Sequence, residues 1–146
     1  ILDEPAAALD PLARTRFLQN LSEFVAELGA SAVLSSHLLS DVERVCDFLI
    51  VLSDSRVQIA GTVGDLLDTH HRVVAPYGGL EQLPPGVEAV HVRHDDRHST
   101  AVVRASGSLP DLPWAVDRVR LEELVLGYMA RVSAARSVTA SREALR

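Results

Sequence analysis

Two adjacent acids, Asp3 and Glu4, follow the apolar pair Ile1-Leu2 and precede Pro5. The apolar pair is typical of the end of a buried strand, and ligands of open α/β sheets bind at the carboxyl ends of the strands. One carboxylate at that edge can hold Mg²⁺, usually through water, while the other faces an attacking water molecule. Because Pro5 biases the preceding residue away from helix, we expect Glu4 to be extended.

His37 is expected to join these two acids. From Asp3 to His37 the sequence predicts a strand, a helix and a second strand, and a helical crossover makes two such strands parallel. Parallel strands end at the same edge of a sheet, so Asp3, Glu4 and His37 should converge there. An imidazole near a phosphate can donate a hydrogen bond to the charge that develops in the transition state.

Helix caps and apolar spacing predict the elements that position these residues. Asp10 suits a helix N-cap, Pro11 the first helical position and Gly29 the C-terminal stop. The apolar residues between them have helical spacing: Leu18, Leu21, Val25 and Leu28. Further along, Asp41 and Glu43 are interpreted as part of the solvated face of a second helix, which covers residues 39–46.

Shorter elements complete the first part of the chain. Strands are predicted at 32–34, 48–52 and 56–60, with Asp54-Ser55 as the turn between the last two. Gly61-Thr62 opens a short helix that ends at Leu67.

The pattern changes near Asp68. Prolines and glycines punctuate the next stretch, and the pair His70-His71 is interpreted as part of a linker. We then expect two strands, at 89–93 and 100–104, around a polar turn. A third strand at 116–119, an amphipathic helix at 121–132 and a polar tail at 133–146 should follow.

Three motifs resemble those of ATP-binding-cassette (ABC) ATPases. Leu2-Asp3-Glu4-Pro5 resembles the Walker B motif with its following catalytic Glu, Ala8-Leu9-Asp10-Pro11 resembles the D-loop, and Ser35-Ser36-His37 resembles the switch-histidine segment. They occur in the order and at the spacing of that family. The resemblance implies an α/β fold over residues 1–68, the C-terminal part of a P-loop NTPase domain with parallel strands. A small α+β accessory domain at 69–132 and a flexible tail at 133–146 would follow.

The resemblance also implies roles for individual residues. Asp3 would position Mg²⁺ through water, and Glu4 would polarise the hydrolytic water. His37 would contact the γ-phosphate of ATP, and Asp10 would lie at a dimer interface that couples two ATP sites. The implied cofactors are ATP and Mg²⁺. The implied partners are a second ATPase domain, bound head to tail, and a transmembrane permease subunit at the cytoplasmic face of the cell membrane, where the ATPase would be peripheral.

Residues 121–129 resemble the closing helix of an accessory domain found after some exporter-type ABC ATPases, so export is the expected direction of transport. The sequence departs from the family in several places. Ala6, Ala7 and Ala8 replace the usual small polar and Gly residues, and Ser55 stands where a turn Gly is usual. A positive φ at Ser55 would cost about 1 kcal/mol.

The sequence contains no G-x-x-x-x-G-K-[ST] P-loop, since all 14 of its basic residues are Arg. It also lacks a Q-loop and the glycine-rich ABC signature. These elements precede Walker B in the family, and the sequence begins within an apolar run, so we expect a fragment that does not hydrolyse ATP by itself.

Composition limits the alternatives. The chain has 146 residues, of which 47% are apolar, and a formal net charge of −6, which argues against a broad electrostatic hold on nucleic acid. An ABC-type ATPase of DNA repair or chromosome organisation remains a second hypothesis. A third is a non-enzymatic interaction module, which the missing P-loop favours.

Overall fold

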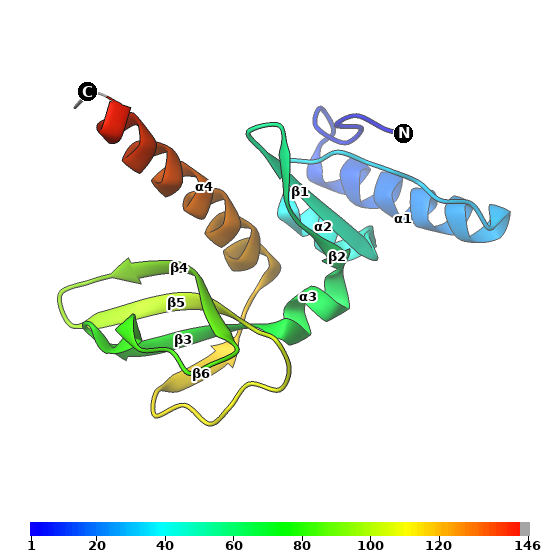
Figure 1. The fold of residues 1–146 in the computed structure, drawn as a ribbon. Helices are drawn as coiled ribbons and strands as arrows, with labels where there is room; N and C mark the ends of the chain where they lie inside the picture. Colours follow the sequence, from blue (N-terminus) through cyan, green and yellow to red (C-terminus); the bar gives the residue numbers. More distant parts are fainter. Residues whose placement is uncertain (144–146) are drawn as a thin grey trace. The chain divides into compact units, whose positions relative to one another are not determined.

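The computed structural model describes the backbone of residues 1–143 and the side chains of residues 1–132. The chain divides into two compact units, Ile1–Asp47 and Phe48–Arg146. The boundary between these units lies at residues 47–48, before the domain boundary expected at residue 68. The expected boundary stays a prediction. Figure 1 shows the elements along the chain.

The first unit contains two helices, α1 at Pro11–Leu28 and α2 at Leu39–Val45. The helix predicted after Asp10-Pro11 is confirmed as α1. The predicted N-cap is confirmed too, because the Asp10 side chain accepts hydrogen bonds from the N–H groups at the start of this helix. Gly29 ends the helix in the left-handed conformation, with φ of 58°. The helix α2 has no side-chain N-cap.

The parallel strands expected around α1 appear only as a single parallel bridge between Leu2 and Leu34. The residues of the predicted strand at 32–34 otherwise form no regular strand, and the Ile1 side chain is fully exposed. A parallel ladder needs several consecutive pairs of residues, and the described part of this unit supplies one pair.

The two helices of this unit contact each other. Leu18 of α1 is 1% exposed and Val42 of α2 is buried. Asp41 is also buried, which corrects its interpretation as a solvated residue. Its carboxylate lies 3.8 Å from the guanidinium of Arg14 on α1, and this ion pair explains how a charged side chain is accommodated there.

The second unit begins with an antiparallel hairpin of β1 at Phe48–Ser53 and β2 at Arg56–Thr62. The turn residues Asp54 and Ser55 both have positive φ, at 51° and 59°. A two-residue turn of this kind matches the right-handed twist of the strands. The predicted short helix follows as α3 at Val63–Thr69, with the Thr62 hydroxyl as its N-cap.

A four-stranded antiparallel sheet forms the centre of the second unit, in the order β4-β5-β3-β6. Its strands are β3, β4, β5 and β6, at His70–Pro76, Val87–His94, His98–Ala105 and Ala115–Arg118. The three later strands match the predicted ones, and a short 3₁₀ helix, η1 at Gly79–Glu81, follows β3.

Strand β3 is the element that the sequence analysis missed. The pair His70-His71, interpreted as a linker, begins this inner strand, and His70 is 1% exposed. The prolines and glycines that close and follow this strand led to its interpretation as a linker. In the structure, β5 and β6 supply hydrogen-bonding partners on both sides of β3.

Helix α4, at Leu121–Glu143, covers one face of the four-stranded sheet. Gly127 of this helix faces Val102 on β5, and a Cβ atom at Gly127 would lie 3.6 Å from that side chain, an ordinary van der Waals distance. The predicted apolar stripe is buried at Leu121, Leu124, Val125 and Tyr128. The helix continues beyond Val132, its predicted end, while residues 144–146 of the expected tail lie outside the described residues.

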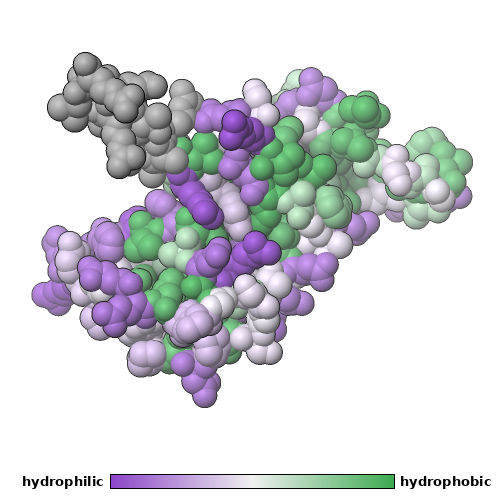
Figure 2. Space-filling model, viewed as in Figure 1, coloured by the Kyte–Doolittle hydropathy of each residue, from purple (hydrophilic) through white to green (hydrophobic). Residues whose placement is uncertain are grey.

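The opposite face of the sheet carries a separate apolar core, formed by Val73, Ala75, Leu80, Val87, Ala101 and Val103. Other apolar side chains stay exposed, and Figure 2 shows hydrophobic surface over the β1–β2 hairpin and over α1. In the part of the chain that the structure describes, no helix combines the length and hydropathy needed to cross a membrane.

Candidate functional site

The parallel bridge at the N-terminal end places the two acids beside the segment that carries His37. The N–H of Leu2 donates to the carbonyl of Val33 over 2.8 Å, and the N–H of Ser35 donates to the carbonyl of Leu2 over 2.9 Å. Because these two hydrogen bonds set the register, Asp3 and Glu4 follow on one side of the bridge while Ser35 and the residues after it follow on the other.

The hydroxyl of Ser35 connects both acids. It donates to Oδ1 of Asp3 over 2.5 Å and accepts from the backbone N–H of Glu4 over 2.8 Å. A hydroxyl can both donate and accept, so one side chain orients the Asp3 carboxylate and the Glu4 backbone together. The sequence analysis gave Ser35 no role of its own; its place in the switch-histidine motif was the only signal.

Glu4 and His37 meet directly. Nδ1 of His37 lies 2.8 Å from Oε2 of Glu4, and the two side chains are 66% and 39% exposed. An ionised carboxylate only accepts, so Nδ1 carries the proton of this hydrogen bond. Nε2 is then an acceptor in the neutral ring and becomes a donor only when the ring is protonated.

The backbone of Glu4 differs from the expectation that Pro5 keeps it extended, because its φ is 45°. A positive φ is uncommon for a residue other than Gly and costs about 1–3 kcal/mol. The hydrogen bond from its N–H to Ser35 and the one from Ala7 N–H to its carbonyl hold this turn in place. Local strain of this kind is concentrated at functional sites.

Asp10 stays at the start of α1 and forms no direct contact with the other predicted site residues. Its Oδ1 accepts from the N–H groups of Leu12 and Ala13, each over 2.9 Å. Asp10 therefore acts as a helix cap in this structure, and its expected role at a dimer interface stays a prediction.

Arg14 is a residue of this region that the sequence analysis missed. Its guanidinium donates to the carbonyl of Ala6 over 3.3 Å and to that of Leu9 over 3.4 Å, and it pairs with Asp41 on α2. Arg14 thus ties the loop between the acids and Asp10 to both helices. Spacing along the sequence offered no signal for it, since the contact with Asp41 depends on how the helices pack.

The residues of this site suit one hydrated divalent cation. No group of three or more acidic, His or Cys side chains that could hold a metal occurs among the described residues. Mg²⁺ needs no such cage, since it keeps several waters and takes one or two carboxylates together with substrate phosphates. Asp3, whose carboxylate is already oriented by Ser35, is the residue that would hold it.

Comparison with known proteins supports this interpretation of the motifs. No protein-family model matches the chain. It is 41% identical over 66 residues to the ABC-type transporter ATP-binding protein EcsA of Bacillus subtilis, which covers 45% of the chain and 26% of the relative. The chain is a homologue of ABC transporter ATP-binding proteins.

Two further relatives match more of the chain's length. The molybdenum import ATP-binding protein ModC of Aromatoleum aromaticum is 31% identical over 85% of the chain and 33% of the relative. The Nod factor export ATP-binding protein I of Rhizobium meliloti is 34% identical over 64% of the chain and 28% of the relative. The chain thus spans about a quarter to a third of these ABC proteins, whose names include both import and export.

Proposed function

We propose that this chain supplies the metal-binding and water-activating part of the ATP site in an ATP-hydrolysing subunit of an ABC transporter. The observation that carries the proposal is the pairing of Glu4 with His37 beside an oriented Asp3. Its homologues are ATP-binding proteins of ABC transporters. Phosphoryl transfer depends mainly on positioning and electrostatic stabilisation, and these three side chains are arranged to provide both.

The proposed roles follow from the chemistry of the three side chains. The Asp3 carboxylate holds hydrated Mg²⁺, which neutralises charge on the β- and γ-phosphates of ATP when bound. The Glu4 carboxylate accepts a hydrogen bond from the attacking water. His37 donates to the γ-phosphate, which requires Nδ1 to leave Glu4 or Nε2 to carry a proton. A switch of His37 between Glu4 and phosphate would free Glu4 for the water molecule.

The proposed partners match those of the family. A second ATPase domain would bind head to tail, with Asp10 at the interface, and a transmembrane permease would bind the pair at the cytoplasmic face of the membrane. Closure on ATP and opening after hydrolysis would drive the permease. The chain itself forms no cradle for the phosphates, because its sequence holds no Lys and no P-loop. We therefore propose that the chain by itself is inactive.

We propose export as the direction of transport, on the resemblance of residues 121–129 to the closing helix of exporter-type ATPases. Import is the second candidate, and a specific observation favours it. Two molybdenum import proteins and one methionine import protein match 80–85% of the chain, whereas the Nod factor export protein matches 64% and two other methionine import proteins match 60%. Transport of a radiolabelled substrate into or out of inverted membrane vesicles that contain the assembled transporter distinguishes the two.

The test of the ATPase proposal is Glu4→Gln in a protein that carries this chain together with a P-loop. Hydrolysis should fall by at least about a hundredfold, since general base catalysis contributes 10²–10⁴-fold, while ATP binding is retained. Glu27→Gln, on the exposed face of α1, is the matched control and should keep full turnover.

Near wild-type turnover in Glu4→Gln would show that Glu4 does not activate water. If the parent protein carries a P-loop yet neither binds nor hydrolyses ATP, the non-enzymatic interaction module becomes the better description.

A further inference from the structure

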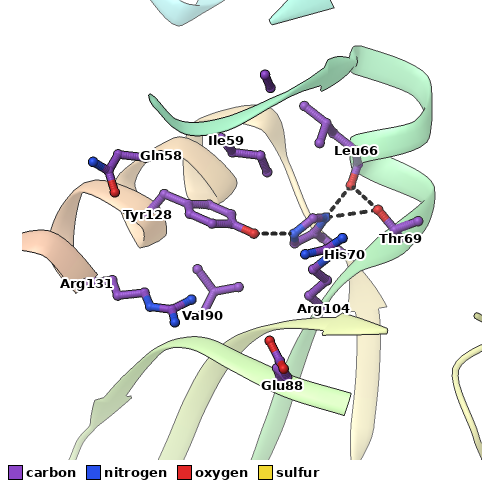
Figure 3. Close-up of a pocket in the computed structure, with 11 residues that line it drawn as sticks. Gln58, Ile59, Leu66, Thr69, His70, Glu88, Val90, Arg104, Tyr128 and Arg131 are labelled. Carbon is purple, nitrogen blue, oxygen red and sulfur yellow. Dashed lines mark hydrogen bonds between the residues drawn. The ribbon is translucent and has the colours of Figure 1, made fainter. Parts of the chain in front are cut away.

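A pocket lies within the second unit, and none of the residues assigned to ATP hydrolysis lines it. It is open to solvent, has a volume of about 410 Å³ and is lined by residues of the β1–β2 hairpin, the four-stranded sheet and α4. Figure 3 shows its lining, in which side chains from the sheet face side chains from the helix. Its charged groups come from Glu88, Arg104 and Arg131.

The register of the sheet brings three of the lining residues into one row. Arg104 on β5 is paired with Glu88 on β4 and with His70 on β3. Paired residues of neighbouring strands point to the same face of the sheet, so these three side chains lie side by side. Tyr128 and Arg131 are three positions apart on α4 and therefore share the helix face that looks onto this row.

Most polar groups around the pocket already have hydrogen-bonding partners. Nδ1 of His70 donates to the carbonyl of Leu66 over 2.7 Å, so Nε2 accepts from the hydroxyl of Tyr128 over 2.9 Å. The Thr69 hydroxyl donates to the carbonyl of Asp65, and the Gln58 amide donates to that of Ser53. These groups form a fixed wall and offer no free proton to a ligand.

The two arginines are different. Neither the Arg104 nor the Arg131 guanidinium forms a hydrogen bond or ion pair with any of the described side chains, although Glu88 is nearby. Burial has the largest effect on the pKa of the Tyr128 hydroxyl and raises it, while the charges of Arg104 and Arg131 lower this pKa and that of Glu88 raises it. All three charges therefore act on one point, and the positive charges outnumber the negative one.

Three larger apolar residues also line the pocket: Ile59, Leu66 and Val90. Leu66 and Val90 are buried, and they come from α3 and β4. A ligand that fills this space would place an apolar body against these side chains and a charged end between the arginines. Arg binds carboxylates and phosphates through two parallel N–H groups.

We propose that this pocket binds a small organic anion, with its carboxylate or phosphate held between Arg104 and Arg131 and its apolar part against Ile59, Leu66 and Val90. This site is independent of the proposed ATPase function, because none of its residues belongs to the Asp3, Glu4 and His37 cluster. The ligand would touch α4 and two strands of the sheet at once, so that binding stabilises the packing of the second unit.

The test is a titration of the 146-residue chain, without nucleotide, with butyrate and with butyl phosphate, followed by NMR chemical shifts. The backbone amides of Arg104 and Tyr128 should shift in a saturable way with at least one of these anions, and the better of the two identifies the headgroup. The uncharged control, 1-butanol, has the same apolar body and should bind at least about fivefold more weakly, because it lacks the charge-assisted hydrogen bonds.

Three variants assign the binding to the arginines. Arg104→Gln and Arg131→Gln should each weaken anion binding by about fivefold or more, whereas Arg93→Gln, at the exposed end of β4, should leave it unchanged. All three side chains are exposed, so folding should be retained. The proposal is wrong if neither anion produces saturable shifts, if butanol binds as tightly, or if the Arg93 variant weakens binding as much as the other two.

Discussion

Nδ1 of His37 lies 2.8 Å from Oε2 of Glu4, although 33 positions separate the two residues in sequence. Both side chains belong to motifs that the sequence analysis selected, and a single parallel bridge between Leu2 and Leu34 brings those motifs together. The carboxylate of Glu4 and the imidazole of His37 thus contact each other without a bound ligand. The geometric part of the prediction, that Asp3, Glu4 and His37 converge, agrees with this arrangement, while their catalytic roles stay proposals.

Ser35 provides a first test of how the two acids are oriented. Removing its hydroxyl in Ser35→Ala leaves the Asp3 carboxylate and the Glu4 N–H without their shared partner. The loss of a hydrogen bond to a charged group corresponds to about 1.5–3 kcal/mol. In a protein that carries this chain with a P-loop, we expect kcat of ATP hydrolysis to fall about tenfold or more. Ser22→Ala, on the exposed surface of α1, is the control and should keep kcat. Equal kcat values in both variants would show that Ser35 does not orient the acids.

Asp10 tests the capping of α1 separately from any interface role. Asp10→Ala removes the acceptor for the N–H groups of Leu12 and Ala13 and should lower the free energy of unfolding by about 1 kcal/mol. Asp10→Asn keeps a capping oxygen and should lose much less. Urea denaturation of the 146-residue chain, followed by far-ultraviolet circular dichroism, measures both. Unequal ATPase rates between the Asn variant and the wild type, at equal stability, would reveal the interface role in the intact protein.

The β1–β2 turn predicts a stabilising substitution. Ser55 has φ of 59°, where a side chain costs about 1–2 kcal/mol that Gly avoids. The greater freedom of Gly in the unfolded chain offsets part of this gain. Ser55→Gly should therefore raise the free energy of unfolding by about 0.5–1 kcal/mol. Ser53→Gly, in the strand just before the turn, is the control and should lower it. Thermal unfolding of both variants decides the matter, and a lower midpoint for Ser55→Gly would contradict the strain argument.

His70 predicts a dependence of stability on pH. Burial has the largest effect on its pKa and lowers it from the ordinary value of 6.5, and the charges of Arg104 and His71 lower it further, against the hydrogen bond to Leu66. The unfolded chain therefore binds a proton at a higher pH than the folded chain does. The contribution of neutral His70 is fully present above pH 6.5 and is lost as the pH falls below that value towards the lowered pKa.

The measurement compares urea unfolding of the wild type and His70→Gln across pH 5–8, where histidine side chains titrate. The wild type should lose stability more steeply than the variant on the acid side, whatever their difference at neutral pH. His71→Gln, at the neighbouring half-buried position, is the control for the other histidines and should keep the steep slope. Parallel curves for the wild type and His70→Gln would rule out this role for His70.

Local chemistry made much of the chain predictable. The Asp10 cap, the Gly29 stop and the Asp54-Ser55 turn each depend on residues within a few positions, so the sequence alone placed α1 and the hairpin. The motifs around Asp3 and His37 were recognisable for the same reason, since each is a short string of residue types in a family order.

Only the tertiary structure decided which distant side chains meet. His70 and Tyr128 are 58 positions apart, and their hydrogen bond turns two residues of unremarkable sequence context into the wall of a pocket. Burial of Asp41 likewise depends on Arg14 reaching across from another helix. A hydrogen bond or ion pair between two distant segments produces no periodic pattern in the sequence of either segment. Its energy is gained only when packing brings both partners together and removes water from them.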